Sequence, residues 1–321
     1  MKDTARRPFI IVLIAAAILS ATTIFLRTFL LLTAYRADIG HFNETPLATV
    51  VFPLLFVLAL VLFFSFGFIE KDSLGDNGLY ASLPTVFASA FTAIAFAVWM
   101  ITTLPLVFSQ RGTTALFGIL MFLFAFGLIA YFVCTALSAV DKSIRAALCL
   151  CAALFCILYV LFSYFDTSFV LNSPIKVFDQ ITMIVFSVFF LAECRLHFGG
   201  IRYFVYLPIV LFAAMIGSTN ALSALIYAAV AREPLMGGVM HDFIILALVL
   251  YTVARLAALL PREAVKERES IYKEALAPHA PVDKTATEDT LPLGDPDQEA
   301  FDFDATDADK ADGDADEATE D

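Results

Sequence analysis

Long apolar runs, separated by short polar segments, occupy the first 260 residues of the chain. Each run is near or above the roughly 20 residues that a helix needs to cross the hydrocarbon core of a bilayer at 1.5 Å per residue. The pattern predicts an all-α, polytopic membrane protein with about eight transmembrane helices. The predicted spans cover residues 9–34, 47–69, 85–108, 113–139, 146–165, 175–194, 203–231 and 242–260.

Composition supports the same class. The chain has 321 residues, of which 60 % are hydrophobic and 16 % charged, whereas a soluble domain has about 25 % charged residues. The first apolar run follows Lys2, Arg6 and Arg7, as in a signal peptide. It is longer than a signal-peptide core and no small-residue cleavage site closes it, so we expect a retained first helix. The lipid bilayer is therefore the expected surrounding of residues 1–260.

Charge divides the chain into a nearly neutral body and an acidic tail. Residues 283–321 contain 16 acidic and two basic residues, a balance of −14, whereas the whole chain carries −12, which leaves +2 for residues 1–282. The tail is poor in apolar residues and predicts disorder. The segment between the last span and the tail combines helix formers with charges of both signs. We therefore predict a transmembrane domain (1–260), a cytoplasmic juxtamembrane helix (261–277) and a disordered acidic tail (278–321).

Basic residues predict the orientation. With the N-terminus inside, the cytoplasmic segments contain twelve Lys and Arg residues, and the outer loops contain four. This positive-inside bias predicts that both termini are cytoplasmic. A cell membrane is the expected location, and the compact loops favour a bacterial cytoplasmic membrane.

Two similar helix starts suggest an internal repeat. "NETP" at 43–46 and "NSP" at 172–174 each place Thr or Ser as an N-cap and Pro at the first helical position. The spans that they open run in the same direction and end at Glu70 and Glu193. A parallel 4+4 repeat would produce this pattern. The two spans differ in length, so chance similarity between apolar sequences is the alternative.

The sequence contains no recognisable catalytic or metal-binding motif. The cysteines of residues 149–156 follow C-x-C-x₄-C, which lacks zinc-site spacing and has no nearby histidine, and the histidines are scattered over both sides of the membrane. We expect no enzyme activity, no metal and no cofactor. The residues considered are Cys134, Cys149, Cys151, Cys156, Cys194, His41, His197, His241 and His279.

Polar and charged residues close to the spans are the best candidates for a site, because burying them in a membrane is costly. Two interpretations of the outer group remain open. Lys176 and Asp179 share a helix face and could act as interfacial anchors, with Lys176 snorkelling to the headgroups. Alternatively, the group lines an outward-facing polar pocket in which Arg27 pairs with a carboxylate, Asp179 first. The outer candidates are Arg27, Asp166, Lys176, Asp179, Asn220 and Asp242, and the inner ones are Glu70, Glu193, Arg195 and Arg255.

The sequence predicts only broad classes of function. The favoured hypothesis is a non-catalytic membrane protein, such as a sensor, scaffold or complex subunit, whose acidic cytoplasmic tail contacts a protein partner. "FDFD" at 301–304 could dock into a basic, apolar groove. No nucleic-acid partner is expected. The alternative is a small-molecule transporter or permease, although ion-coupled carriers place ionisable groups near the midplane and this chain does not.

Overall fold

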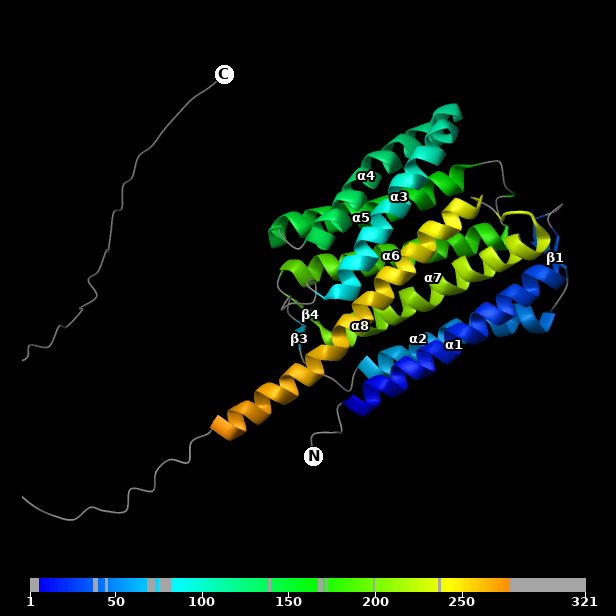
Figure 1. The fold of residues 1–321 in the computed structure, drawn as a ribbon. Helices are drawn as coiled ribbons and strands as arrows, with labels where there is room; N and C mark the ends of the chain where they lie inside the picture. The colour runs from blue at the N-terminus through cyan, green and yellow to red at the C-terminus, as the bar shows by residue number, and fades with distance from the viewer. Residues whose placement is uncertain are drawn as a thin grey trace, which may run out of the picture. The chain divides into compact units, whose positions relative to one another are not determined.

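Eight α-helices make up most of the described part of the chain (Figure 1). The computed structural model describes residues 6–36, 40–43, 46–67, 73–74, 82–137, 140–166, 170, 173–198, 200–235 and 238–276. The helices are α1 (Arg6–Thr33), α2 (Pro46–Gly67), α3 (Leu83–Ser109), α4 (Gly112–Leu137), α5 (Lys142–Phe165), α6 (Pro174–Phe198), α7 (Tyr203–Ala231) and α8 (Gly238–Leu276).

Two short strand pairs mark the two ends of the bundle. β1 (Tyr35–Arg36) and β2 (His41–Phe42) pair antiparallel between α1 and α2. β3 (Ser73–Leu74) follows α2 and pairs antiparallel with β4 (Ile201–Arg202), which lies between α6 and α7. The second pair therefore joins a segment that follows α2 to the connection between α6 and α7. We refer to the two ends as the β1–β2 end and the β3–β4 end.

The described helices form a multi-pass membrane protein. Seven of them, α1 and α3 to α8, contain segments of 22 to 29 residues that are long and apolar enough to cross a bilayer. In α2 the described apolar segment is shorter, Val50–Phe66, within a helix of 22 residues. The helix starts at Pro46 and Pro174 agree with the predicted ones. The eighth span, the orientation of the termini and the 4+4 repeat stay predictions.

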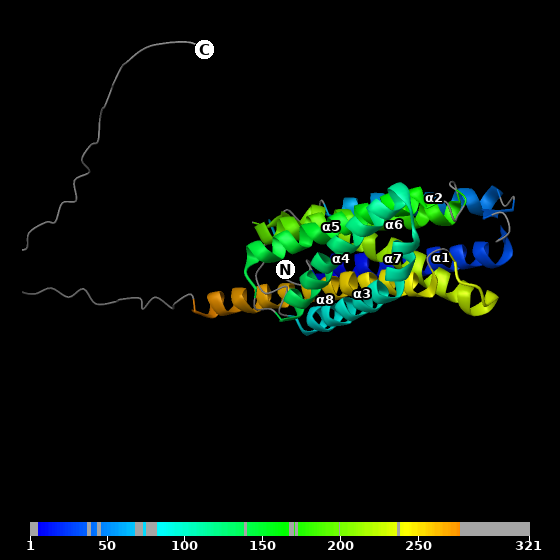
Figure 2. The same cartoon turned by 90° about the horizontal axis from the view of Figure 1, so that it is seen from above.

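Helices α7 and α8 are the most deeply buried spans, with two thirds or more of their apolar segments inside the bundle. Helices α3 to α6 pack in chain order, each against the next, and α7 packs against α6 and also against α1 and α2. Figure 1 shows α1 and α2 on one flank of the bundle and α3, α4 and α5 on the other, and Figure 2 shows the same bundle from above. The chain thus returns to its first two helices mainly through α7, and Phe178 of α6 also contacts Phe52 and Phe56 of α2.

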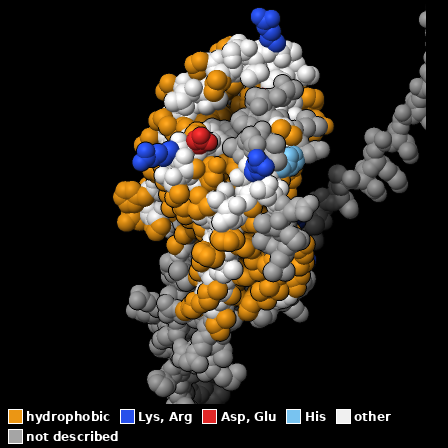
Figure 3. Space-filling model, turned by 90° about the vertical axis from the view of Figure 1, so that its right-hand side faces the viewer, with side chains coloured by type: hydrophobic (Ala, Val, Ile, Leu, Met, Phe, Trp, Pro, Cys, Tyr) orange, Lys and Arg blue, Asp and Glu red, His pale blue; other side chains and the backbone are white. Residues whose placement is uncertain are grey.

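The outer surface of the bundle is apolar, as lipid contact requires. Large hydrophobic side chains are exposed along the helices, including Phe25, Leu123 and Ile184. Figure 3 views the molecule from the β1–β2 side, where hydrophobic side chains surround a few charged ones. The arginines exposed in the loops of that end are Arg36, Arg111 and Arg232.

Aromatic rings and one glycine bring the buried helices together. Phe96, Trp99 and Phe155 pack edge to face, with ring centroids 5.5 to 6.2 Å apart. At Gly217 of α7, an added Cβ would lie 2.6 Å from Cγ2 of Val249 and 2.7 Å from Cζ of Phe186. Helices α6, α7 and α8 approach closely at this point because position 217 has no side chain.

The last helix continues well beyond its apolar segment. The span Gly238–Leu259 is the first part of α8, which extends over 39 residues to Leu276. The segment predicted as a separate juxtamembrane helix is thus continuous with the preceding span. The chain separates into the units Met1–Glu274 and Ala275–Asp321. The predicted acidic tail and Glu70 lie outside the described residues.

Candidate functional site

Four helices place polar side chains around the carboxylate of Asp179, and we call Tyr159, Asp179, Asn220 and His241 the Asp179 cluster. Oδ1 of Asp179 is 2.8 Å from Nε2 of His241 and accepts a 3.0 Å hydrogen bond from Nδ2 of Asn220. Oδ2 accepts a 2.9 Å hydrogen bond from the hydroxyl of Tyr159. All four residues are buried. A buried carboxylate is stable only when donors surround it in this way.

Tyr159 and His241 also contact each other through their rings. Their rings stack with centroids 4.9 Å apart and planes 3° from parallel, and the Tyr159 hydroxyl lies 3.1 Å from Nε2 of His241. Asp179 lies five residues after the start of α6 at Pro174, and His241 lies three residues after the start of α8 at Gly238. Both helices begin at the β1–β2 end, so the two side chains reach the same depth.

Two buried polar atoms beside Asp179 have no hydrogen-bond partner among the described residues. They are Nδ1 of His241 and Oδ2 of Asp242, and both residues are at most 3 % exposed. Leaving such an atom unsatisfied costs roughly 1–3 kcal/mol. The cluster therefore has capacity to bind a further polar group.

Arg27 of α1 approaches the cluster but contacts a ring rather than a carboxylate. It is 4 % exposed, and its Cζ lies 3.7 Å from the centroid of Phe178. Asp179 and Asp242 act on it electrostatically, yet within the described residues no ion pair joins Arg27 to either of them. The predicted Arg27–Asp179 pair is therefore wrong, since the histidine of α8 occupies that carboxylate.

A cavity of about 420 Å³ adjoins Arg27. Its size lies within the range of about 300–1,000 Å³ that is typical of small-molecule sites. Apart from Arg27, its lining is apolar and comes mainly from α2, α6 and α7. The lining residues are Arg27, Leu30, Phe42, Phe52, Pro53, Phe56, Pro174, Ile175, Val177, Phe178, Ile181, Phe212 and Ile216.

Lys176 and Asp166 belong to a different contact. Lys176 is fully buried, and its Nζ donates a 2.8 Å hydrogen bond to the carbonyl oxygen of Asp166 and a 3.4 Å one to that of Tyr164. A cation at this position satisfies the last carbonyl groups of α5. Lys176 therefore fixes the α5–α6 connection and does not snorkel to the surface. Ser173, the predicted N-cap of α6, donates its hydroxyl to the carbonyl oxygen of Gly40 at 2.8 Å.

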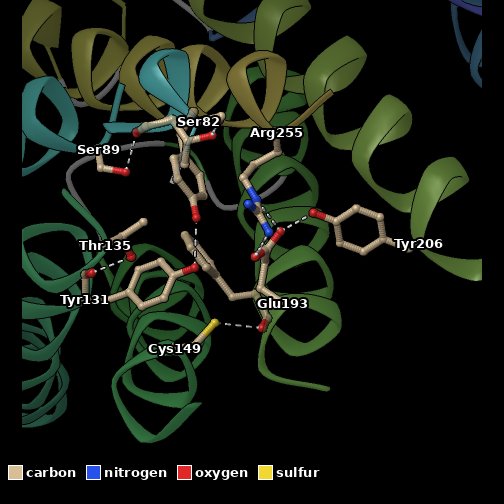
Figure 4. Close-up of polar contacts among 11 residues, drawn as sticks. Ser82, Ser89, Tyr131, Thr135, Cys149, Glu193, Tyr206 and Arg255 are labelled. Carbon is tan, nitrogen blue, oxygen red and sulfur yellow. Dashed lines mark hydrogen bonds and ion pairs between the residues drawn. The ribbon is translucent and has the colours of Figure 1, made fainter. Parts of the chain in front are cut away.

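A second buried cluster lies toward the β3–β4 end, and we call Glu193, Tyr206 and Arg255 the Glu193 cluster (Figure 4). Nε and Nη2 of Arg255 bind the two carboxylate oxygens of Glu193 at 3.0 and 2.9 Å, a bidentate ion pair. The hydroxyl of Tyr206 donates to Oε1 of Glu193. All three residues are at most 1 % exposed. Arg195, on the same helix as Glu193, is exposed instead.

Tyrosine and cysteine side chains extend the polar contacts near the Glu193 cluster. The hydroxyls of Tyr131 and Tyr251 lie 2.8 Å apart. Sγ of Cys149 donates to the carbonyl oxygen of Phe190 at 3.0 Å, and Sγ of Cys194 donates to that of Ala146 at 3.4 Å. The five cysteines are free thiols. Among the described residues, no group of three or more His, Cys, Asp and Glu side chains is arranged to hold a metal.

The two clusters join the same pair of helices at two depths. Asp179 and Glu193 are fourteen residues apart on α6, and so are His241 and Arg255 on α8. Fourteen residues correspond to roughly 21 Å along a helix axis and to nearly four turns, so each pair shares a helix face. Phe186 and Val249, which meet at Gly217, lie between the clusters. An apolar layer therefore separates the two sets of charges.

The structure brings together part of the predicted outer group and adds residues that the sequence did not single out. Asp179 and Asn220 are bonded directly, and Arg27 and Asp242 lie beside them. Tyr159 and Tyr206 escaped notice because a tyrosine within an apolar run resembles a core residue. His241 could have been found from its position next to Asp242 at the start of the last span.

Comparison with known proteins identifies no relative. No protein-family model matches the chain, and neither a curated protein nor a solved structure matches it.

Proposed function

We propose that this integral membrane protein is a non-catalytic binding protein that holds a small ligand in the cavity beside the Asp179 cluster. The observation that carries the proposal is the position of Arg27. Its buried guanidinium lines an otherwise apolar cavity, and Asp179 of the cluster acts on it electrostatically. An apolar cavity with a few convergent polar groups is the usual form of a small-molecule site.

A sensing role fits the described geometry better than catalysis does. Asp179 and His241 resemble a base and the residue that orients it, but in the described part of the chain no serine, threonine or cysteine forms a hydrogen bond with His241. A nucleophile within hydrogen-bond reach of the base would be needed for covalent catalysis. His241 instead binds Asp179 and Tyr159. We therefore assign the cluster a structural role next to Arg27, which is the charged residue that lines the cavity.

The orientation and partners of this binding protein follow from the charge pattern. The positive-inside bias places the β1–β2 end, and with it the cavity, in the outer half of a cell membrane, which we take to be a bacterial cytoplasmic membrane. The acidic tail would then contact a cytoplasmic protein. Helix α8 connects the two sides, because it contains His241 and continues to Leu276.

A permease for the same ligand is the second candidate function. It is favoured by the Glu193 cluster, which supplies a second buried charged site on the same two helices. Uptake of a bound ligand into proteoliposomes would distinguish a permease from a sensor. Abolished uptake with retained binding in Glu193→Gln would support the permease.

The proposal is tested by filling the cavity. Ile181 lines the cavity and is 43 % exposed, whereas Ile184, one turn further along α6, is 48 % exposed and is not among the lining residues. We expect native mass spectrometry of the full chain, extracted in mild detergent, to show a bound small molecule of discrete mass. Ile181→Trp should lose this mass and Ile184→Trp should keep it. A wild-type protein without the mass, or an Ile181→Trp variant that retains it, would contradict the proposal.

A further inference from the structure

The guanidinium of Arg27 is available for an anionic ligand. Within the described residues its direct partner is the ring of Phe178, which covers one face of the guanidinium and uses none of its five N–H donors. Asp179 is already engaged by Tyr159, Asn220 and His241. Neither Asp179 nor Asp242 lines the cavity, whereas Arg27 does. A ligand in the cavity would therefore meet a cation and no carboxylate.

The remaining lining selects for a hydrocarbon. Phe52, Phe56 and Phe212 contribute aromatic surface, and Ile216 contributes aliphatic surface. An apolar chain matches such a lining, because burying apolar surface away from water is favourable. A small hydrophilic anion would gain nothing from this surface. The ligand should therefore combine one anionic group with an apolar chain.

The cavity opens on the surface of the bundle that faces lipid. Val177 and Ile181 line it and are 42 % and 43 % exposed. Both lie on α6 near the β1–β2 end, close to the expected depth of the headgroups. An amphiphile that is already in the bilayer could reach the cavity sideways, with its charged end at the level of Arg27.

The charge and volume of the site favour a ligand with one apolar chain and one negative charge. A single guanidinium can balance one negative charge, and its fork matches a carboxylate in a bidentate geometry. The volume of about 420 Å³ is in the lower part of the range for drug-sized ligands, which argues against a lipid with two acyl chains.

From these features we propose that the ligand is a long-chain carboxylate, bound with its headgroup on Arg27 and its chain in the apolar cavity. The proposal rests on the proposed binding function and narrows it to one chemical class. Phe178 lies against one face of the guanidinium and leaves its N–H groups for the headgroup.

Binding of radiolabelled palmitate to the full chain tests this proposal. The protein is reconstituted in phosphatidylcholine nanodiscs, and unlabelled palmitate, hexadecanol and acetate are used as competitors. Hexadecanol has the same chain without the charge. We expect saturable palmitate binding, with hexadecanol at least about tenfold weaker, as loss of a charge-assisted contact requires, and no competition by acetate.

Variants assign the binding to the named residues. Arg27→Gln should weaken palmitate at least about tenfold and leave hexadecanol unchanged, whereas the control Arg111→Gln, which removes an exposed arginine of the β1–β2 end, should change neither. Ile181→Trp should abolish both. Arg27→Lys keeps the positive charge and should still bind palmitate more tightly than hexadecanol. This variant tests the role of the charge even if Arg27→Gln fails to fold.

Each other outcome overturns a defined part of the proposal. Equal competition by palmitate and hexadecanol that is lost in Ile181→Trp would refute the charged ligand but keep the binding function. Displacement of palmitate by phosphatidylglycerol at equal potency would refute the single chain. Absence of saturable palmitate binding would refute the long-chain carboxylate as the ligand. The proposed binding function would still be tested separately by the native mass spectrometry experiment.

Discussion

Glu193 and Arg255 form an ion pair whose two side chains are fully buried. Taking two ions out of water is costly, and their bidentate contact offsets that cost only while both are present. We therefore expect removal of either residue to destabilise the protein mainly because the other residue is left as an unpaired buried charge.

A double-mutant cycle tests this expectation. Glu193→Gln and Arg255→Met should each lower the free energy of unfolding by about 3–5 kcal/mol, and the double variant should lose clearly less than the sum. Unfolding of the full chain by dodecyl sulfate in mixed micelles measures these differences. Arg195→Met, two residues from Glu193 but exposed, should change the free energy by no more than about 0.5 kcal/mol. Additive single effects would show that the pair is not coupled.

At the same scale, the sequence indicated which charges matter but not their partners. The rarity of charge in the spans made Asp179, Glu193 and Arg255 candidate site residues, because buried ions need a reason to persist, and all three are buried in the structure. The partner of Asp179 lies 62 residues away on α8, and such pairings depend on helix order, which local patterns do not contain. The predicted snorkelling of Lys176 is wrong because its side chain instead donates to carbonyl oxygens at the end of α5. Its spacing from Asp179 in the sequence indicates nothing about these acceptors.

At the scale of elements, the apolar runs predicted the helices well because lipid imposes a minimum length on each span. The packing of the helices against one another depends on single residues such as Gly217, whose importance no periodicity reveals. This glycine lets α7 contact Phe186 of α6 and Val249 of α8 at the layer between the two clusters.

Adding a methyl group at this position should push the three helices apart. Gly217→Ala places a Cβ within 2.7 Å of both Phe186 and Val249, and such overpacking typically costs about 1–3 kcal/mol. We expect a lower thermal unfolding midpoint for the full chain in detergent. Val249→Ala in the same chain removes one clash and should recover part of the loss. An unchanged thermal midpoint in Gly217→Ala would contradict the close packing of α6, α7 and α8 at this position.

At the scale of the whole molecule, the side of the membrane on which each end lies is the main open prediction. The positive-inside pattern assigns the β1–β2 end to the outside and the start of α5 to the cytoplasm. Arg111 and Lys142 are both exposed, at opposite ends of α4, and so report on the two sides.

Single cysteines at these positions decide the orientation. In a chain whose five native cysteines are replaced, Arg111→Cys should react with a membrane-impermeant maleimide in intact cells, and Lys142→Cys should react only after the cells are opened. The reverse pattern would invert the assignment and place the cavity beside Arg27 in the inner leaflet. Labelling of both positions in intact cells would contradict an intervening span.

The packing of α1 and α2 against α7 has a consequence for the order of synthesis. Helix α1 is made first, but its partner α7 follows more than 160 residues later. Arg27 lacks the ring of Phe178 until α6 is made, and the hydroxyl of Thr23 lacks its 2.8 Å contact with Thr219 until α7 is made. Helix α1 must therefore remain in the membrane with the charge of Arg27 exposed to lipid or to the insertion machinery until the second half of the protein has been inserted and packs against it.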